Sequence, residues 1–146
     1  MTRSCRMAVL ALACVGCSGN PSAQDYVPAE DTARTALNAA LRAWAGGETG
    51  SPVPGTSPVV EVADGLRTKG RTLLKYDILG PVPADAPRCF AVRLTLGNPA
   101  QELVERYVVL GIDPLWVWRH DDYVMLTHWD HTMLDKQKKA DQAPKR

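Results

Sequence analysis

The spacing of hydrophobic residues predicts one long helix near the start of the folded part of the chain. Small and apolar residues recur at intervals of three and four over 33–44, and polar residues occupy the opposite face. Glu30 and Asp31 fall in the first turn, where the helix dipole favours acids, and Gly46-Gly47 follows the last turn. Because the apolar stripe is made of small residues and ends on Trp44, we expect this helix to lie close against a sheet.

After a loop rich in glycine and proline over 46–58, the pattern changes to alternation of apolar and polar residues, which is typical of strands. In the segment 89–96, Phe90, Val92, Leu94 and Leu96 are expected to face the core. Val104, Val108 and Leu110 alternate with Glu105 and Tyr107 in a later strand. The predicted strands are 59–63, 71–79, 89–96, 102–111, 115–119 and 123–126, with a turn at 120–122 and a short helix within 129–139.

One long helix followed by successive antiparallel strands is an α+β pattern. We therefore expect the N-terminal helix to pack on a curved antiparallel sheet of about four to six strands. This order of elements resembles the nuclear transport factor two-like and cystatin-like rolls, in which a curved sheet wraps one helix. The resemblance implies the fold and a pocket between helix and sheet, and it transfers no functional residue.

The first residues have the composition of an export signal. Met1 to Arg6 contains two bases and no acid, and Met7 to Val15 is an uninterrupted apolar run. This run is shorter than the ~20 residues that a helix needs to span a bilayer. A secretory signal peptide over 1–16 is therefore the expected reading, and a transmembrane helix is the poorer one.

The boundary of this signal, Cys14-Val15-Gly16-Cys17, resembles the lipobox of bacterial lipoproteins. The resemblance implies that Cys17 is lipidated and that the protein is anchored to a membrane of the cell envelope, facing the periplasm or the exterior. Cys14 stands where leucine is usual, and a second frame ending at Cys14 leaves that residue as the alternative. The expected organisation is a lipidated tether over 17–25, a single domain over 26–135 and a basic tail over 136–146.

The charge distribution argues against a nucleic-acid partner, and the cysteine content argues against an internal disulfide. The tail from Lys136 to Arg146 holds five bases and one acid, whereas residues 17–135 hold ten bases and fifteen acids. A nucleic-acid binder needs a basic face on its folded body, so we expect no nucleic-acid partner. Cys89 is the one cysteine of the expected domain, so no internal disulfide can form. Its thiol is a candidate nucleophile, although a lone cysteine is more often a small buried hydrophobe.

All three histidines of the chain lie within a short acidic stretch. Histidine and carboxylate side chains are common metal ligands, and two of the histidines are three residues apart. The candidate metal ligands are His120, Asp121, Asp122, His128 and His131. Asp121 and Asp122 are explained equally well as the turn of a hairpin.

Aromatic residues gather towards the C-terminal end of the domain. Trp116 and Trp118 share one face of a strand. Packing against the long helix, near Trp44 and with Val117 facing out, is the expected arrangement. A recognition surface made of Trp116, Trp118, Tyr123 and Trp129 is the alternative, because exposed aromatic residues anchor partners.

These features favour an envelope lipoprotein whose domain is a non-enzymatic binding or interaction module. The expected partners are the membrane, through the lipid, and an envelope protein or a cell-wall component. Two alternatives stay open: a small-ligand-binding or weakly catalytic pocket between helix and sheet, and metal binding at the histidine cluster. Glu105 and Asp77 would be acid–base candidates if they met in such a pocket, and ordinary ion-pair partners otherwise. No cofactor and no catalytic residue are expected.

Overall fold

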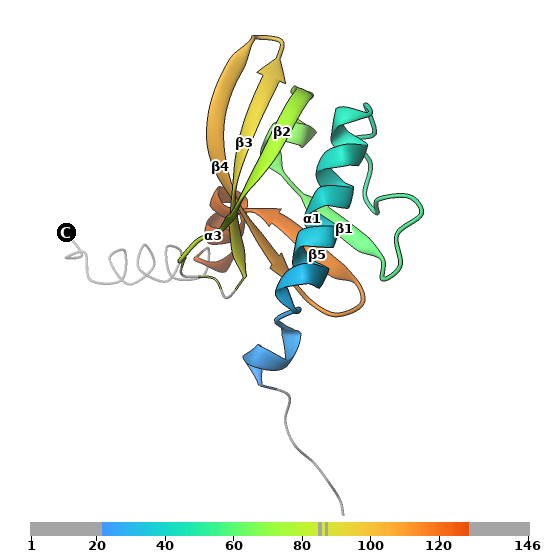
Figure 1. Cartoon of the computed structure of the whole chain (residues 1–146), viewed down its shortest axis with the longest axis vertical. Helices are drawn as coiled ribbons and strands as arrows, with labels where there is room; N and C mark the ends of the chain where they lie inside the picture. The colour runs from blue at the N-terminus through green and yellow to red at the C-terminus, as the bar shows by residue number, and fades with distance from the viewer. Residues whose placement is uncertain (1–21, 85, 87, 129–146) are drawn as a thin grey trace, which may run out of the picture.

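The computed structural model describes residues 22–84, 86 and 88–128, and within them a long helix lies across a curved sheet (Figure 1). The helical elements are a 3-10 turn η1 (Ala23–Tyr26), α1 (Glu30–Ala45), α2 (Gly65–Thr68) and α3 (His120–Thr127). The strands are β1 (Val60–Ala63), β2 (Thr72–Pro81), β3 (Cys89–Gly97), β4 (Gln101–Leu110) and β5 (Leu115–Arg119). The α+β class and the helix-on-sheet arrangement are confirmed. No helix of this described part is long and apolar enough to cross a membrane.

The described strands form a sheet of order β1-β5-β4-β3-β2. β2 to β5 pair antiparallel, but β1 runs parallel to β5, with Val60 opposite Leu115 and Ala63 opposite Trp118. The sheet is therefore mixed: β2 to β5 form the expected antiparallel arrangement, and the parallel edge strand β1 is the one departure from it among the described strands. The chain reverses direction at each of the four connections between consecutive strands. β5 therefore runs in the same direction as β1, beside which it lies.

The predicted strand 123–126 is also wrong, because these residues belong to α3. Asp121 and Asp122 stand in the first turn of this helix. Acidic residues favour both a tight turn and a helix N-terminus, where they interact with the exposed N–H groups. The same residues therefore indicated a hairpin turn in the sequence while forming the start of a helix in the fold.

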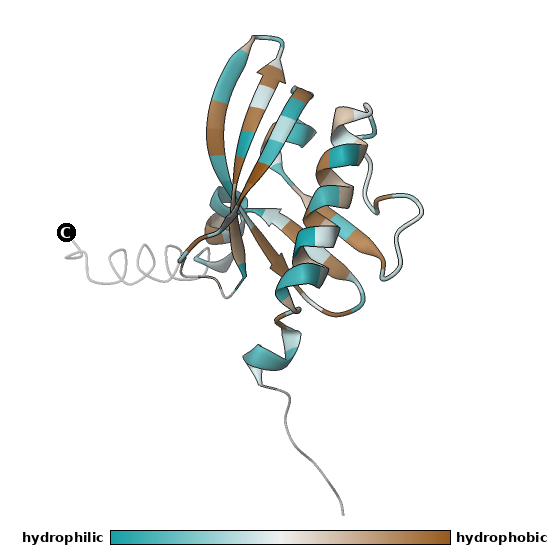
Figure 2. Ribbon diagram, viewed as in Figure 1, coloured by the Kyte–Doolittle hydropathy of each residue, from teal (hydrophilic) through white to brown (hydrophobic). Residues whose placement is uncertain are grey.

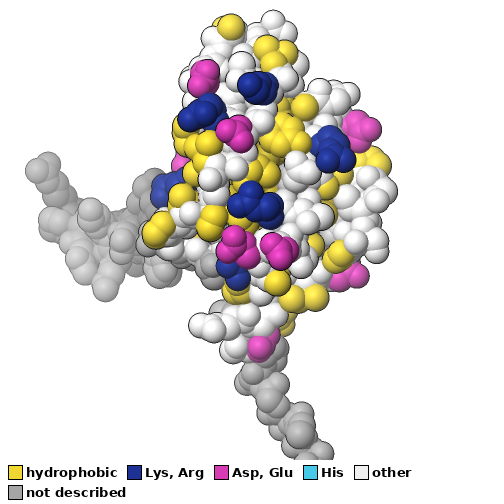
Figure 3. Space-filling model, in the orientation of Figure 1, with side chains coloured by type: hydrophobic (Ala, Val, Ile, Leu, Met, Phe, Trp, Pro, Cys, Tyr) yellow, Lys and Arg dark blue, Asp and Glu magenta, His cyan; other side chains and the backbone are white. Residues whose placement is uncertain are grey.

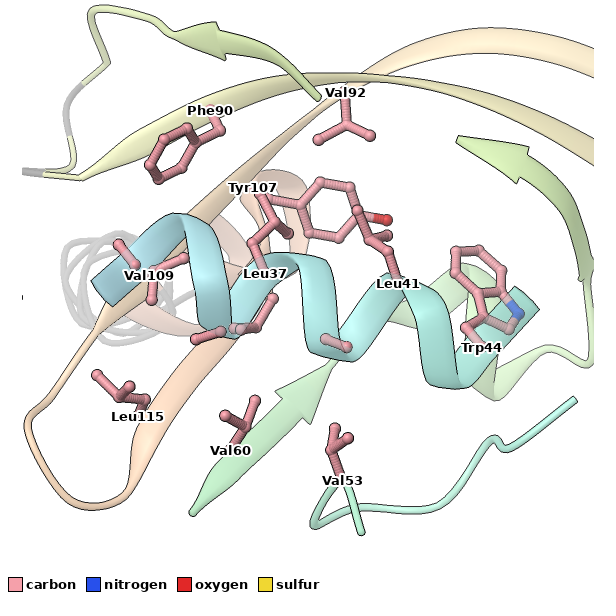
Figure 4. Packing of buried hydrophobic residues seen from close by; sticks show 14 of the residues in the cluster. Leu37, Leu41, Trp44, Val53, Val60, Phe90, Val92, Tyr107, Val109 and Leu115 are labelled. Carbon is pink, nitrogen blue, oxygen red and sulfur yellow. The ribbon is translucent and has the colours of Figure 1, made fainter. Parts of the chain in front are cut away.

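α1 presents its small-residue stripe to one face of the sheet (Figure 4). Leu37, Leu41 and Trp44 belong to one buried cluster with the inner residues of β3, where the four residues expected to face the core are all fully buried. The indole N–H of Trp44 also donates a hydrogen bond of 2.8 Å to the backbone oxygen of Arg71. Buried side chains fill the central part of the space between the helix and the sheet.

Two strands bury the opposite faces from those expected. In β4, Tyr107 and Val109 face α1, while Val108 lies on the other side of the sheet and Val104 is 58% exposed. In β5, Val117 is buried beneath α1 and the tryptophans point away from it. Both strands carry apolar residues in both phases of the alternation, so period two alone does not identify the inner face.

The alternation of inward and outward residues along β2 is interrupted near its start. Irregular pairing between Leu73 and Lys75 lets Leu73 face the core while Leu74 is 62% exposed. A β-bulge of this kind changes the face that later residues occupy. Tyr76 then faces α1 and donates a hydrogen bond of 2.8 Å to the side-chain oxygen of Asn38.

A second hydrophobic cluster lies on the opposite side of the sheet. It contains Ala86, Cys89 and Val108, and Trp118 and Tyr123 pack against it. α3 contributes Tyr123 and contacts β4 and β5. Both faces of the sheet are thus partly covered, and Figure 2 shows hydrophobic residues along the strands and on the side of α1 turned towards them.

Candidate functional site

The outer face of β5 carries two tryptophans on the side of the sheet away from α1. Trp116 and Trp118 stack, with ring centroids 5.6 Å apart and an angle of 29° between the planes. Trp118 reaches the second cluster, whereas Trp116 is 38% exposed. The expected packing against α1, beside Trp44, is therefore wrong.

Glu61 lies next to Trp116, because the parallel pairing of β1 and β5 sets these residues opposite each other. The hydroxyl of Ser51 donates a hydrogen bond to the Glu61 carboxylate and accepts one of 2.8 Å from the backbone N–H of Val62. Among the described residues Glu61 has no cationic partner. We refer to Glu61, Trp116 and Trp118 together as the tryptophan face.

The other members of the aromatic set lie elsewhere. Tyr123 is half-buried in α3 and packs on the second cluster beside Trp118. Trp129 lies outside the described residues. The structure thus brings Trp116, Trp118 and Tyr123 to one side of the sheet, and Trp116 is the most exposed of the three tryptophans whose surroundings are described.

A network of charged residues lies where β1 and β5 end. We call it the buried network because its Asp64 is buried, although Asp121 is exposed. Arg119, the last residue of β5, donates two hydrogen bonds to Asp122, from Nε at 2.9 Å and from Nη2 at 3.2 Å. Its Nη1 lies 3.1 Å from Asp121 and 3.7 Å from Glu105, and its Nε lies 3.9 Å from Asp64. One guanidinium therefore holds four carboxylates together.

Asp64 connects this network to α2. Its Oδ1 accepts the backbone N–H groups of Leu66 and Arg67 as an N-cap, and its Oδ2 accepts the hydroxyl of Tyr107 at 2.6 Å. Asp122 in turn accepts the backbone N–H of Gly65 at 2.7 Å. A Cβ at position 65 would lie 2.9 Å from Oδ1 of Asp122, so a larger residue here would have to displace this carboxylate.

The network shifts the pKa values of its members in opposite directions. Burial raises the pKa of Glu105, and the nearby carboxylates of Asp121, Asp64 and Asp122 add to this effect while Arg119 opposes it. Burial also pushes the pKa of Asp122 upward, but the hydrogen bonds from Arg119 and Gly65 outweigh it and lower the pKa below its usual value.

Burial and the charge of Asp64 raise the pKa of Tyr107 well above its usual value, so its hydroxyl stays a hydrogen-bond donor. The carboxylate oxygens of Asp64 and Asp122 accept hydrogen bonds from N–H and O–H groups of this same chain. We interpret the network as a structural connection that fixes α2 and α3 at the end of the sheet.

The residues of the candidate metal site diverge. His120 begins α3 and His128 follows its last residue, which separates them by roughly 12 Å along the helix. Asp121 and Asp122 turn towards Arg119 instead. Over residues 22–128, apart from the undescribed positions 85 and 87, no three potential ligands are grouped to hold a metal ion. His131 lies outside the described residues.

The buried cysteine does not have the surroundings of a nucleophile. Cys89 is 3% exposed within the second cluster. Burial raises the pKa of its thiol, and the charge of Arg106 opposes this shift without reversing it. A reactive thiol needs a lowered pKa and access to solvent, so the candidate nucleophilic role is not supported.

Asp77 and Glu105 lie on opposite faces of the sheet, because Asp77 is paired with Arg93 and Glu105 with the buried Val92. Arg93 lies 3.9 Å from Asp77 and 3.7 Å from Glu102 in an open hollow of about 480 Å³ on the outer face. The acid–base pair considered from the sequence does not form. These residues make the cross-strand ion pairs that were the alternative.

A second open groove, of about 500 Å³, lies between α1 and the β1–β5 side of the sheet, which contributes Val60 and Leu115, and the loop containing Thr56 and Pro58 borders it. Its polar lining is made of hydroxyl groups and Asp31, without a cluster of titratable groups. Basic and acidic side chains are interspersed on the face that Figure 3 displays, and no patch of one sign dominates it.

Sequence reasoning missed Asp64 and Arg119, which organise the buried network. Aspartate ahead of a short helical segment is the usual N-cap signal, and Asp64 holds this position before α2. Arg119 and Asp122 are three residues apart, a spacing that brings them together once α3 is recognised as a helix. Comparisons with protein families, with curated proteins and with solved structures found no match for this chain.

Proposed function

We propose that this protein is an exported lipoprotein of the cell envelope, anchored through Cys17, whose folded body is a non-enzymatic module that binds a partner through the tryptophan face. The N-terminal segment supports the address, since it combines a signal peptide with a lipobox-like boundary. The exposure of Trp116 beside a stacked second indole is the single observation that carries the binding function.

A large aromatic residue left on the surface gives up part of the free energy that burial would provide. Aromatic side chains with few rotatable bonds are common anchors of protein interfaces. The polar residues of the buried network already form hydrogen bonds with one another, and the thiol of Cys89 is buried. Binding on the outer face of β5 therefore fits the arrangement better than chemistry at the network.

Cross-linking in the producing cell tests the binding function. A photoreactive residue placed at Ile112, which is 55% exposed in the connection leading to β5, would report a neighbouring partner. We expect an adduct that Trp116→Ala removes and that Leu74→Ala preserves, since Leu74 is exposed on a distant strand. Thermal unfolding of both variants checks that they fold. An adduct of equal yield in both variants would contradict the proposal.

Intact mass of the protein from membranes of the same cell tests the address. We expect a chain that begins at Cys17 and carries a diacylglycerol and an acyl chain. Cys17→Ser should abolish this species, whereas Cys14→Ser should leave it unchanged. An unlipidated mature chain would remove the anchor, and a chain beginning at Cys14 would move the site to the alternative frame.

A further inference from the structure

The carboxylate of Glu61 is the feature of the tryptophan face that points to the chemistry of the partner. It lies beside an exposed indole, and no arginine or lysine in the described part of the chain neutralises it. We infer that the tryptophan face binds a lysine- or arginine-bearing segment of a partner protein, with the cation held between the face of Trp116 and the Glu61 carboxylate. This inference rests on the proposed binding function and specifies its partner.

Two independent attractions favour a cation at this position. The face of an indole ring attracts ammonium and guanidinium groups through its quadrupole, and tryptophan does so more strongly than the other aromatic residues. A carboxylate within reach adds a charge-assisted hydrogen bond. Because Trp118 stacks on one face of the Trp116 ring, a lysine or arginine would approach the other face, along which its aliphatic part can lie.

Glu61 is also held in place. The Ser51 hydroxyl that donates to its carboxylate is itself fixed by the backbone N–H of Val62. The carboxylate therefore loses less side-chain entropy on binding than a freely rotating glutamate would. A side chain that is ordered before binding is typical of a recognition residue. Glu61 is ordered by the Ser51 hydroxyl, without an ion pair to any base among the residues that the structure describes.

The edge of the sheet beside Glu61 is already covered, which limits how a partner can approach. The backbone N–H of Val53 donates to the carbonyl oxygen of Val60 at 2.8 Å, and Ser51 takes the N–H of Val62. A partner strand cannot add to β1 at these positions, because their hydrogen-bonding groups are occupied. The partner must therefore lie on the face of the sheet and use its side chains.

Other classes of partner fit less well. A neutral sugar could stack on the indoles, but it would leave the Glu61 charge without a counterion. An anionic lipid or polymer would meet the carboxylate and a body that carries fifteen acids against ten bases over 17–135. Charge complementarity thus favours a basic polypeptide segment.

Nuclear magnetic resonance of the indole N–H groups tests this inference on the intact mature chain. The four tryptophans give separate signals, and the Trp116→Ala spectrum identifies the one from Trp116. The probes are acetylated tetralysine amide, tetraarginine amide, tetraglutamate amide and tetra-N-acetylglucosamine. We expect the two basic peptides to shift the Trp116 signal while the buried Trp44 signal stays unchanged.

Two variants of equal charge provide the matched comparison. Glu61→Gln should weaken binding of the basic peptides about threefold, as expected for the loss of one exposed ion pair. Glu102→Gln removes the same charge from a distant strand and should leave the affinity unchanged. Equal weakening in both variants would mean general charge attraction, and it would overturn the inference.

The remaining outcomes separate this inference from the proposed function. If the sugar shifts the Trp116 signal and the basic peptides do not, the inference of a cationic partner is contradicted, while the proposal that the tryptophan face binds a partner is supported. If Lys136, Lys138 and Lys139 are changed to glutamine and the Trp116 signal of the protein alone shifts, the occupant is the chain's own tail, which also overturns the inference. Loss of the proposed function itself would appear as a cross-link that does not depend on Trp116.

Discussion

The hydroxyl of Tyr107 donates a hydrogen bond of 2.6 Å to Oδ2 of Asp64. Tyr107 lies in β4 and Asp64 follows β1, and these strands are separated in the sheet by β5. Both residues are almost fully buried, Tyr107 at 1% and Asp64 at 5% exposed. The bond therefore joins the start of α2 to a non-adjacent strand inside the molecule, where a lost partner cannot be replaced easily by water.

Asp64→Ala should lower the free energy of unfolding by about 3 kcal/mol, because it removes the cap of α2 and leaves the Tyr107 hydroxyl without its acceptor. Urea unfolding followed by tryptophan fluorescence measures this. Asp64→Asn keeps a capping side chain and a hydrogen-bond acceptor, so it should cost clearly less. Equal losses in the two variants would mean that the charge of Asp64, rather than its hydrogen bonds, stabilises the fold.

Glu105 should make stability fall as pH rises above about 4.5, its usual pKa. Its pKa is raised in the folded state, so the folded protein holds this proton more tightly than the unfolded chain does. That preference is fully present below the unfolded pKa and is lost as pH passes through the folded one. Urea unfolding across pH 4 to 8 should therefore show the wild type losing stability relative to Glu105→Gln.

Asp122 should change the stability of the fold with pH in the opposite direction to Glu105. Its pKa is lowered in the folded state from the usual 3.8, so its contribution is present above that value and lost as pH falls through the folded pKa. Asp122→Asn should therefore remove stability at neutral pH and progressively less towards acid. The same pH trend in the Glu105 and Asp122 variants would contradict the opposite roles assigned to these two carboxylates.

The helix α1 and the strand β3 could be predicted from the sequence because the large apolar residues of each lie mainly on one face. α1 shows a single apolar stripe, and β3 alternates cleanly, so periodicity identifies the inner residues of both. β5 reads Leu-Trp-Val-Trp, with large apolar residues in both phases. Which phase faces the helix then depends on the volume available beneath α1, which no local pattern contains.

The tryptophan face could be predicted only in part for the same reason. Trp116 and Trp118 are recognisable as a pair from their spacing. Glu61 lies beside them through the parallel pairing of β1 with β5, which joins segments more than fifty residues apart in the sequence. Strand order is a property of the whole sheet, so the residue that decides the charge of this face was not among the sequence candidates.

Cys89 should react with thiol reagents at least about a hundredfold more slowly in the folded protein than in urea at pH 7.4, because labelling requires an opening of the second cluster. The raised pKa of the thiol slows the reaction further. A chain beginning at Ser18 leaves Cys89 as the single cysteine, so the modified mass reports it alone. Rapid labelling of the folded chain would contradict the burial of this side chain and reopen its candidacy as a nucleophile.

Trp44→Ala and Trp116→Ala should differ strongly in their effect on stability. Trp44 is 2% exposed and its N–H bonds to the backbone oxygen of Arg71, so its removal should cost about 3–5 kcal/mol. Trp116 is 38% exposed, and its loss should cost about 1 kcal/mol, mainly the stacking with Trp118. Urea unfolding of the two variants measures both values. A cost for Trp116→Ala as large as that for Trp44→Ala would make Trp116 a core residue, and the argument that its exposure reflects a binding role would fail.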